Sequence, residues 1–267
     1  MAALASGSFE WCTSPALLLS TLPPFATPPT TIIDVGCGTS SLLSVISNHL
    51  SPQTPLKTIA IDINATALAA TVASNHLLHD LTTPLPPTTP CAFHTADLIL
   101  DKSSLDYFLV YYPPNLISQY LENILTLLHP TGYFHLTTFN ASSLLTPILT
   151  SLFTTIKTTT VPQSSQQHDA KPTFVYVCSN PRPLQPTLTL TITTSLDEHF
   201  KTAAPLPTTH INWATPLPLK DAYPRMFDSN MQAVYELDDF ESDVERMLPG
   251  VDTLTAKQAV MFLQEMQ

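Results

Sequence analysis

Thr31 to Ser41, TIIDVGCGTSS, is the stretch that decides the fold of this 267-residue chain. Two isoleucines lead into Asp34, glycines follow at Gly36 and Gly38, and a leucine-rich helical pattern begins directly afterwards. Glycine lets the backbone turn sharply and approach a ligand closely. The N-terminus of a helix favours an anionic group through its free N–H groups and its dipole. This order of strand, glycine turn and helix predicts a nucleotide-cofactor cradle, with an ordinary strand-to-helix turn as the alternative.

Hydrophobic patterns on either side of this stretch predict alternating helices and strands. Helices are expected at 16–22, 41–50, 65–75, 115–129 and 142–153. Strands are expected at 30–35, 56–62, 77–81, 96–101 and 133–139. Pro147 is expected to kink the last of these helices or to delay its start. Two further β-rich segments, 154–161 and 173–178, predict an antiparallel hairpin.

Beyond residue 180 the pattern changes. Leu and Ile alternate with Thr at 187–193, which predicts one more strand, and helices are expected at 238–248 and 255–266. We therefore expect a cofactor-binding domain at 1–180 and a C-terminal α+β extension at 181–267, with a role in substrate or partner contacts.

Composition narrows the choice of partners. Lys and Arg total 10 against 21 acidic residues, for a formal charge of −11. This balance argues against nucleic acid or an anionic membrane as a partner. No apolar run reaches the ~18 to 20 residues that a membrane span needs. A cytoplasmic protein is expected, because a mitochondrial location, the alternative, would call for an Arg-rich presequence.

The cysteines and histidines show no metal-ligand spacing, so no metal is expected. The four cysteines are scattered and too few for a disulfide framework, which indicates a reducing compartment. The acidic run at 236–245 is interpreted as a solvated helix face. A docking surface for a basic substrate protein is the alternative interpretation of that run.

Carboxylates stand at the ends of two predicted strands. Asp62 ends the second strand, where it can accept hydrogen bonds from ribose hydroxyls. A solvated strand end or a helix cap is the alternative. Asp101 ends the strand at 96–101 beside Lys102, and we expect it to face the mouth of the active site, because ligands of open α/β sheets bind at strand carboxyl ends.

These motifs resemble one branch of the class I S-adenosylmethionine (SAM) methyltransferases. Asp-x-Gly-x-Gly at 34–38 resembles motif I of that superfamily, and the expected hairpin distinguishes its seven-stranded sheet from a parallel dinucleotide-binding sheet. Phe9-Glu10-Trp11, VGCGTSSL at 35–42 and DKSSLD at 101–106 look like the seven-β-strand protein lysine methyltransferases. Closest are the citrate synthase lysine methyltransferase and the dual elongation-factor lysine and N-terminal methyltransferase. The resemblance covers roughly residues 9–180 and implies a Rossmann-like α/β sheet with helices on both faces.

The resemblance also implies SAM as cofactor and methyl transfer to a lysine amine of a protein substrate. The expected cofactor contacts are Trp11, Asp34, Gly36, Gly38, Ser40, Asp62, Ile63, Asp80 and Leu81. Among them, Asp62 would hold the ribose, and Asp80 with Leu81 would meet the adenine. Asp101 is the expected catalytic residue, which holds the amine and aids loss of its proton. Its alternative role is an electrostatic partner for Lys102 or for the ammonium of the cofactor.

Two departures from the branch keep other functions open. Ser103 stands where the motif has Gly, and the chain starts only a few residues before Phe9, whereas relatives carry an N-terminal segment that helps cover the cofactor. A catalytically inactive SAM-binding scaffold is therefore an alternative, as is methylation of a small molecule or of a protein N-terminus. A nicotinamide-dependent dehydrogenase is disfavoured, because Ser41 stands where a dinucleotide fingerprint has its third Gly.

Overall fold

A computed structural model describes six ranges of the chain: residues 13–50, 56–87, 93–161, 173–203, 216–218 and 253–255. The chain divides into two compact units, residues 1–196 and 197–267. In the second unit, β8 (Pro216–Pro218) pairs with β9 (Thr253–Thr255) in antiparallel fashion. The helices expected at 238–248 and 255–266 lie outside the described residues, apart from Thr255 in β9. Within the described ranges, no helix is long and apolar enough to cross a bilayer.

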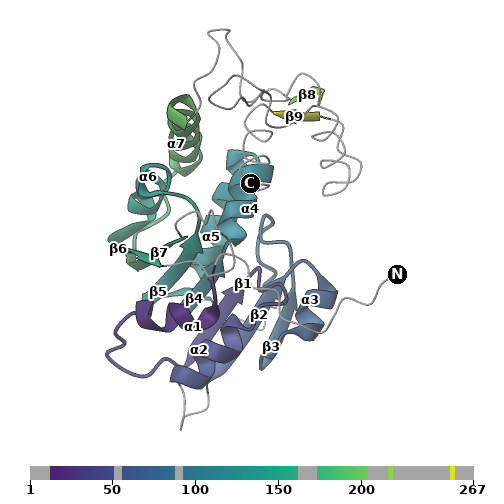
Figure 1. The fold of residues 1–267 in the computed structure, drawn as a ribbon, viewed down its shortest axis with the longest axis vertical. Coiled ribbons are helices and arrows are strands. Elements are labelled where there is room, and N and C mark those ends of the chain that lie inside the picture. The colour runs from purple at the N-terminus through teal and green to yellow at the C-terminus, as the bar shows by residue number, and fades with distance from the viewer. Residues whose placement is uncertain are drawn as a thin grey trace, which may run out of the picture. The chain divides into compact units, whose positions relative to one another are not determined.

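Seven strands form one mixed sheet in the order β3-β2-β1-β4-β5-β7-β6 (Figure 1). They are β1 (Thr31–Val35), β2 (Lys57–Asp62), β3 (Asn75–Leu78), β4 (Ala96–Lys102), β5 (Leu128–Thr138), β6 (Phe153–Val161) and β7 (Thr173–Pro181). The first five strands pair in parallel, and β7 is antiparallel to both β5 and β6. The expected Rossmann-like sheet with a terminal antiparallel hairpin is therefore confirmed.

Helices alternate with strands along the chain, as is typical of an α/β fold (Figure 1). They are α1 (Pro15–Leu18) with the 3₁₀ turn η1 (Leu19–Thr21), α2 (Leu42–Leu50), α3 (Ala65–Ala70), α4 (Ser104–Tyr111), α5 (Pro114–Leu127), α6 (Ser142–Leu152) and α7 (Leu188–Ala203). The short helix α4 was not predicted. Pro147 lies inside α6, whose start at Ser142 is not delayed.

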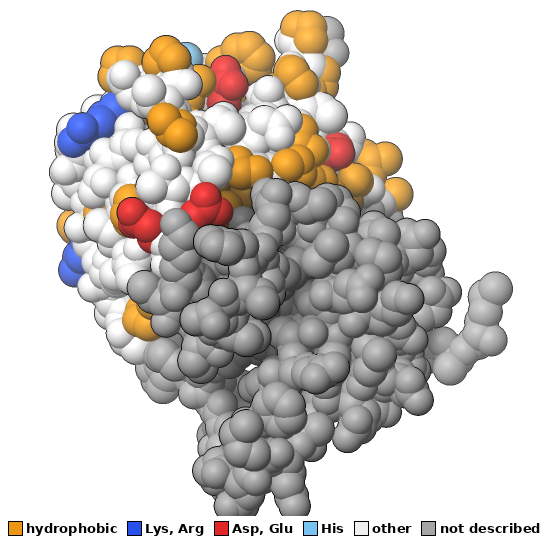
Figure 2. Space-filling model, turned by 90° about the horizontal axis from the view of Figure 1, so that it is seen from above, with side chains coloured by type: hydrophobic (Ala, Val, Ile, Leu, Met, Phe, Trp, Pro, Cys, Tyr) orange, Lys and Arg blue, Asp and Glu red, His pale blue; other side chains and the backbone are white. Residues whose placement is uncertain are grey.

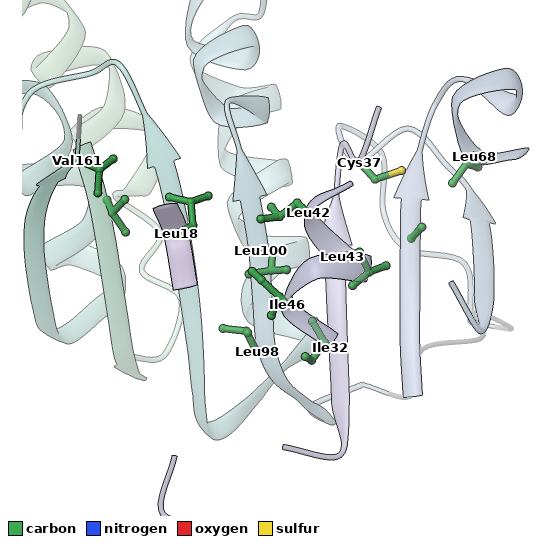
Figure 3. Close-up of a cluster of buried hydrophobic side chains, with 12 residues drawn as sticks. Leu18, Ile32, Cys37, Leu42, Leu43, Ile46, Leu68, Leu98, Leu100 and Val161 are labelled. Atoms are coloured by element: carbon green, nitrogen blue, oxygen red, sulfur yellow. The ribbon is translucent and has the colours of Figure 1, made fainter. Parts of the chain in front are cut away.

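One face of the sheet packs against α1 and α2 in a hydrophobic cluster (Figure 3). Leu98 and Leu100 of β4 belong to it, together with Leu43 and Ile46 of α2, and all four are fully buried. Side chains alternate between the two faces of a strand. Asp101, one residue after Leu100, therefore belongs to the opposite face, where α5 lies.

The helix expected at 65–75 is too long, because α3 ends at Ala70. Thr71 has extended backbone angles, φ −88° and ψ 135°. Its hydroxyl donates to the carbonyl oxygens of Ala67 and Gly38, both at 3.1 Å. A threonine side chain that bonds to nearby carbonyls competes with continued helix formation. The chain thus leaves α3 early and enters β3 at Asn75.

The strand expected at 187–193 is wrong, because this segment begins the helix α7. Leu188, Ile192 and Leu196 recur every four residues and are 3%, 0% and 1% exposed. Leu190, which alternation would place on the same face, is 65% exposed. Leu188 and Ile192 fit both patterns, since residues four apart also share one face of a helix.

The buried stripe of α7 leads to a prediction about stability. We expect Ile192→Ala to lower the free energy of unfolding by about 2 to 4 kcal/mol, because it leaves a cavity in a packed core. Leu190→Ala, the matched control on the same helix, is expected to change it by less than ~0.5 kcal/mol. Urea unfolding followed by circular dichroism measures both. Equal losses in the two variants would contradict the helical assignment.

Candidate active site

A pocket of about 400 Å³ lies at the carboxyl ends of β1, β2 and β4. The chain runs from β1 to β2 and β3 on one side and returns to β4 on the other, so this is the switch point at which open α/β sheets bind ligands. The described residues that line the pocket include eight of the nine expected cofactor contacts: Asp34, Gly36, Gly38, Ser40, Asp62, Ile63, Asp80 and Leu81. Trp11 lies outside the described residues.

The two glycines of the β1–α2 turn serve different ends. Both have positive φ, +61° at Gly36 and +52° at Gly38. A Cβ added at Gly36 would overlap the side chain of Ser104, the first residue of α4. A Cβ added at Gly38 would meet nothing within 4 Å. The missing side chain at Gly36 therefore lets α4 approach the turn. Gly38 itself lines the pocket, and its missing side chain leaves the space beside it open.

Asp62 is held at the pocket by two backbone donors. The N–H of Gly38 donates to its Oδ2 at 2.8 Å, and the N–H of Asn64 donates to its Oδ1 at 2.8 Å. Each carboxylate oxygen can accept more than one hydrogen bond. Asp62 thus links the glycine turn to β2 and retains acceptor capacity for ligand hydroxyls. This arrangement fits the ribose contact expected of it.

Cys37 lies between the two glycines as a buried free thiol. Burial raises its pKa to about 12, and the neighbouring Asp34 carboxylate acts in the same direction. Its Sγ lies 3.6 Å from the hydroxyl of Thr71. A thiol of such high pKa is neutral at physiological pH and is a poor nucleophile. Its contact with Thr71 joins the turn to the end of α3.

The loop after β3 brings Asp80 and Leu81 to the pocket, and α5 fixes this loop. Asn123 of α5 is 3% exposed. Its side-chain amide donates to the carbonyl of Leu81 at 2.8 Å and to that of Thr83 at 2.7 Å. Sequence reasoning missed this contact. The available signal was a polar residue three positions after Tyr120 on the buried face of an amphipathic helix.

The expectation that Asp101 faces the mouth of the active site is wrong. Its side chain is 1% exposed and does not line the pocket. It accepts hydrogen bonds from the hydroxyl of Tyr120 at 2.6 Å and from the N–H groups of Ser104 at 2.7 Å and Leu105 at 3.1 Å. Strand alternation turns it toward α5, and the N-terminus of α4 attracts its charge. Asp101 thus positions α4.

Asp106 ties the other side of α4 to the end of β5. Its carboxylate accepts from the hydroxyl of Thr138, the amide of Asn140 and the N–H of Phe139. Burial raises the pKa of Asp106, against the effect of these donors. Ser103, which precedes α4, has φ +71° and thus adopts a conformation that glycine favours. The loop keeps this conformation although serine replaces the glycine of the motif.

An aromatic wall, formed by Tyr107, Phe108 and Tyr112, lines the pocket on the α4 side. The ring centroids are 5.2 to 6.1 Å apart, and the ring planes are tilted against one another by 59° to 73°. Phe108 also packs on the buried Tyr120, with centroids 4.5 Å apart. The pocket therefore combines a glycine turn, carboxylates and aromatic rings.

Together, the switch-point pocket, the glycine turn and the carboxylate at the end of β2 define a nucleotide-cofactor-binding α/β protein. A family described as a methyltransferase domain matches residues 26–177, which is more than half of the chain. The chain belongs to this family. The expected class, a SAM-dependent methyltransferase, and its cofactor are thereby supported. No curated protein matches the chain.

Solved structures with a similar fold include phosphoethanolamine N-methyltransferase 1 from Haemonchus contortus, at 14% identity and a TM-score of 0.51, over 70% of this chain and 47% of that one. A second is 1,6-didemethyltoxoflavin-N1-methyltransferase from Burkholderia thailandensis, at 14% identity and a TM-score of 0.44, over 63% and 76%. Three of the matched structures are covered over only about half of their length. At 14% identity, the match with a TM-score of 0.51 shows similarity of the fold alone.

The backbone at Ser103 leads to a prediction about strain. An L-residue in the left-handed region costs about 1 to 2 kcal/mol relative to the right-handed one, a cost that glycine escapes. Ser103→Gly and Ser103→Ala both remove the hydroxyl and differ only in the Cβ. We expect the Gly variant to be more stable than the Ala variant by about 1 kcal/mol in urea unfolding. An Ala variant of equal or greater stability would contradict strain at this position.

The Asn123 contacts lead to a prediction about the pocket. Asn123→Leu leaves the carbonyls of Leu81 and Thr83 without their donor, which costs about 1 to 3 kcal/mol for buried groups. We expect the affinity for S-adenosylhomocysteine to fall at least ~5-fold, since the loop at Asp80 loses its anchor. Ser118→Ala, which removes a different α5 hydrogen bond, to Thr189, is the control and should leave the affinity unchanged. Calorimetric titration distinguishes the two variants, and unchanged affinity in a folded Asn123→Leu variant would refute the positioning role.

Proposed function

We propose that this chain transfers a methyl group from SAM to a lysine amine of a protein substrate. The observation that carries the proposal is one pocket at the sheet switch point that gathers the Gly36–Gly38 turn and the carboxylate of Asp62. Membership of the methyltransferase-domain family supports the methyl donor. The choice of lysine is supported by the sequence motifs Phe9-Glu10-Trp11 and DKSSLD at 101–106. A protein with an accessible lysine, met in the cytoplasm, is the proposed partner.

Different residues of the pocket would contact different parts of the cofactor. SAM, when bound, supplies a methyl group activated by its sulfonium. Gly38 would leave backbone space for the methionyl part, and Asp62 would accept hydrogen bonds from the ribose. Asp80 and Leu81 would meet the adenine from the loop that Asn123 holds. The chain thereby fixes the donor and leaves the α4 side of the pocket for the acceptor.

The acceptor amine must be neutral when it attacks the methyl group. Leu42, Ile63 and Leu81 line the pocket with apolar side chains. An apolar environment lowers the pKa of an ammonium group, because desolvation disfavours its charged form. These apolar side chains would favour loss of the lysine proton at the point where the amine meets the methyl donor. Asp101 acts in this proposal through α4, as a positioning residue.

The cofactor contact at Asp62 can be tested directly by calorimetric titration with SAM and S-adenosylhomocysteine. We expect Asp62→Ala to weaken both affinities about 10- to 100-fold, as the loss of hydrogen bonds to a charged acceptor implies. Glu122→Ala, which removes an exposed carboxylate on α5 outside the pocket, is the matched control and should bind normally. A folded wild-type protein that binds neither compound would contradict the cofactor assignment.

The acceptor is tested separately, with labelled SAM in cell lysates followed by mass spectrometry of the modified products. A methyl group on the Nζ of a lysine supports the proposal. Labelling only of a protein N-terminus or of a small molecule contradicts the lysine assignment and leaves the methyltransferase class intact. Binding of SAM without transfer to any product would favour the inactive scaffold instead.

A further inference from the structure

The aromatic wall, which consists of Tyr107 and Phe108 of α4 and of Tyr112 directly after it, has no part in the cofactor contacts described above. Tyr107 is 48% exposed, and its ring borders the pocket. Phe108 and Tyr112 are half-buried, and all three rings line the pocket. The packing of Phe108 on the buried Tyr120 fixes the base of the wall.

The charges around the wall are predominantly negative. Three carboxylates line the pocket, those of Asp34, Asp62 and Asp80, against one ammonium, that of Lys102. Asp80 lies close enough to Tyr112 to raise the pKa of that phenol, after the larger effects of burial and of Tyr107. On the face shown in Figure 2, acidic and hydrophobic side chains of the described residues lie side by side, while Lys and Arg side chains gather at one edge. The pocket therefore favours a positively charged ligand.

The geometry of the rings distinguishes between two kinds of ligand. A flat base stacks on a ring whose plane is nearly parallel to its own. The rings of the wall are tilted against one another by at least 59°, so a flat base can stack on one of them but not on all three. A compact cation has no such requirement, because it is attracted to any ring face within about 6 Å of the ring centre. Each ring of the wall can therefore attract such a cation through whichever face borders the pocket.

We propose that Tyr107, Phe108 and Tyr112 form a binding subsite for the alkylammonium group of the methyl acceptor. This inference rests on the proposed function, which it extends by assigning the acceptor class: an amine that carries a positive charge before it reacts and after it has been methylated. The wall selects the acceptor and holds it beside the cofactor. It is the contact that Asp101 was expected to provide.

The test uses choline as the cationic probe and 3,3-dimethylbutan-1-ol as its neutral counterpart of the same shape. Both are titrated into the full chain in the presence of saturating S-adenosylhomocysteine and followed by ligand-observed NMR. We expect choline to bind about 10-fold more tightly than the neutral alcohol, as a partly desolvated cation–π site implies. Equal binding of the two probes, or binding of neither, would overturn the proposal.

Three variants locate the effect. Tyr107→Leu should weaken choline binding about 3- to 10-fold and leave that of the neutral alcohol unchanged, whereas Tyr107→Phe, which keeps the ring, should bind both as the wild type does. Phe93→Leu replaces another exposed aromatic residue, one that does not line the pocket, and should bind choline normally. Unchanged choline affinity in a folded Tyr107→Leu variant would refute the assignment.

The affinity for S-adenosylhomocysteine, measured in the same variants, separates this inference from the proposed function. It should be the same in Tyr107→Leu as in the wild type. A loss of this affinity with choline binding retained would assign the rings to the adenine and overturn the proposal, while the cofactor assignment would stand. A peptide with a trimethylated lysine distinguishes the sources of the cation. If this peptide binds more tightly than choline, the ligand is a protein side chain. If it binds less tightly, the ligand is a small amine. Either result supports an alkylammonium subsite.

Discussion

The buried carboxylate of Asp101 holds the elements of the site together. Removal of a carboxylate from water costs several kcal/mol unless donors replace its hydration. Here the donors come from two helices: the N–H groups of Ser104 and Leu105 in α4, and the hydroxyl of Tyr120 in α5. Because Asp101 itself belongs to β4, one side chain fixes both helices to the centre of the sheet. The same interaction also positions Phe108, because this ring packs on Tyr120.

The pKa of Asp101 depends on two opposing effects, its burial and its hydrogen-bond donors. Burial raises its pKa to about 7, with a smaller contribution from Asp106 in the same direction, while Tyr120 and the two N–H groups lower it. A folded-state pKa above the ordinary 3.8 means that the proton is bound more tightly in the folded chain. The contribution of Asp101 to the stability of the folded chain is therefore complete below pH 3.8 and is lost as the pH rises through about 7. The ionised form, which interacts best with the α4 N-terminus, is formed at this cost.

Local patterns predicted the parts of the structure that depend on neighbouring residues. The β1–α2 turn follows from the spacing of Gly36 and Gly38, and the terminal hairpin follows from two β-rich segments joined by a polar loop. The same reasoning failed for the segment at 187–193, since Leu188 and Ile192 fit the strand period as well as a helical stripe. Burial of Leu196 decides between them, and burial is a tertiary property.

The site divides in the same way. Asp62 could be predicted because strand carboxyl ends meet at one edge of a parallel sheet, whatever the packing of the helices. The direction of Asp101 depends on which face of β4 each helix covers, and the contacts of Asn123 join α5 to a loop about forty residues earlier in the chain. Neither is encoded in a short stretch of sequence. The same holds for the aromatic wall, which faces the pocket because Gly36, Asp101 and Asp106 fix the position of α4. Pocket residues in backbone turns can therefore be predicted from the sequence. Pocket residues on α4 can be recognised only when the position of that helix is known.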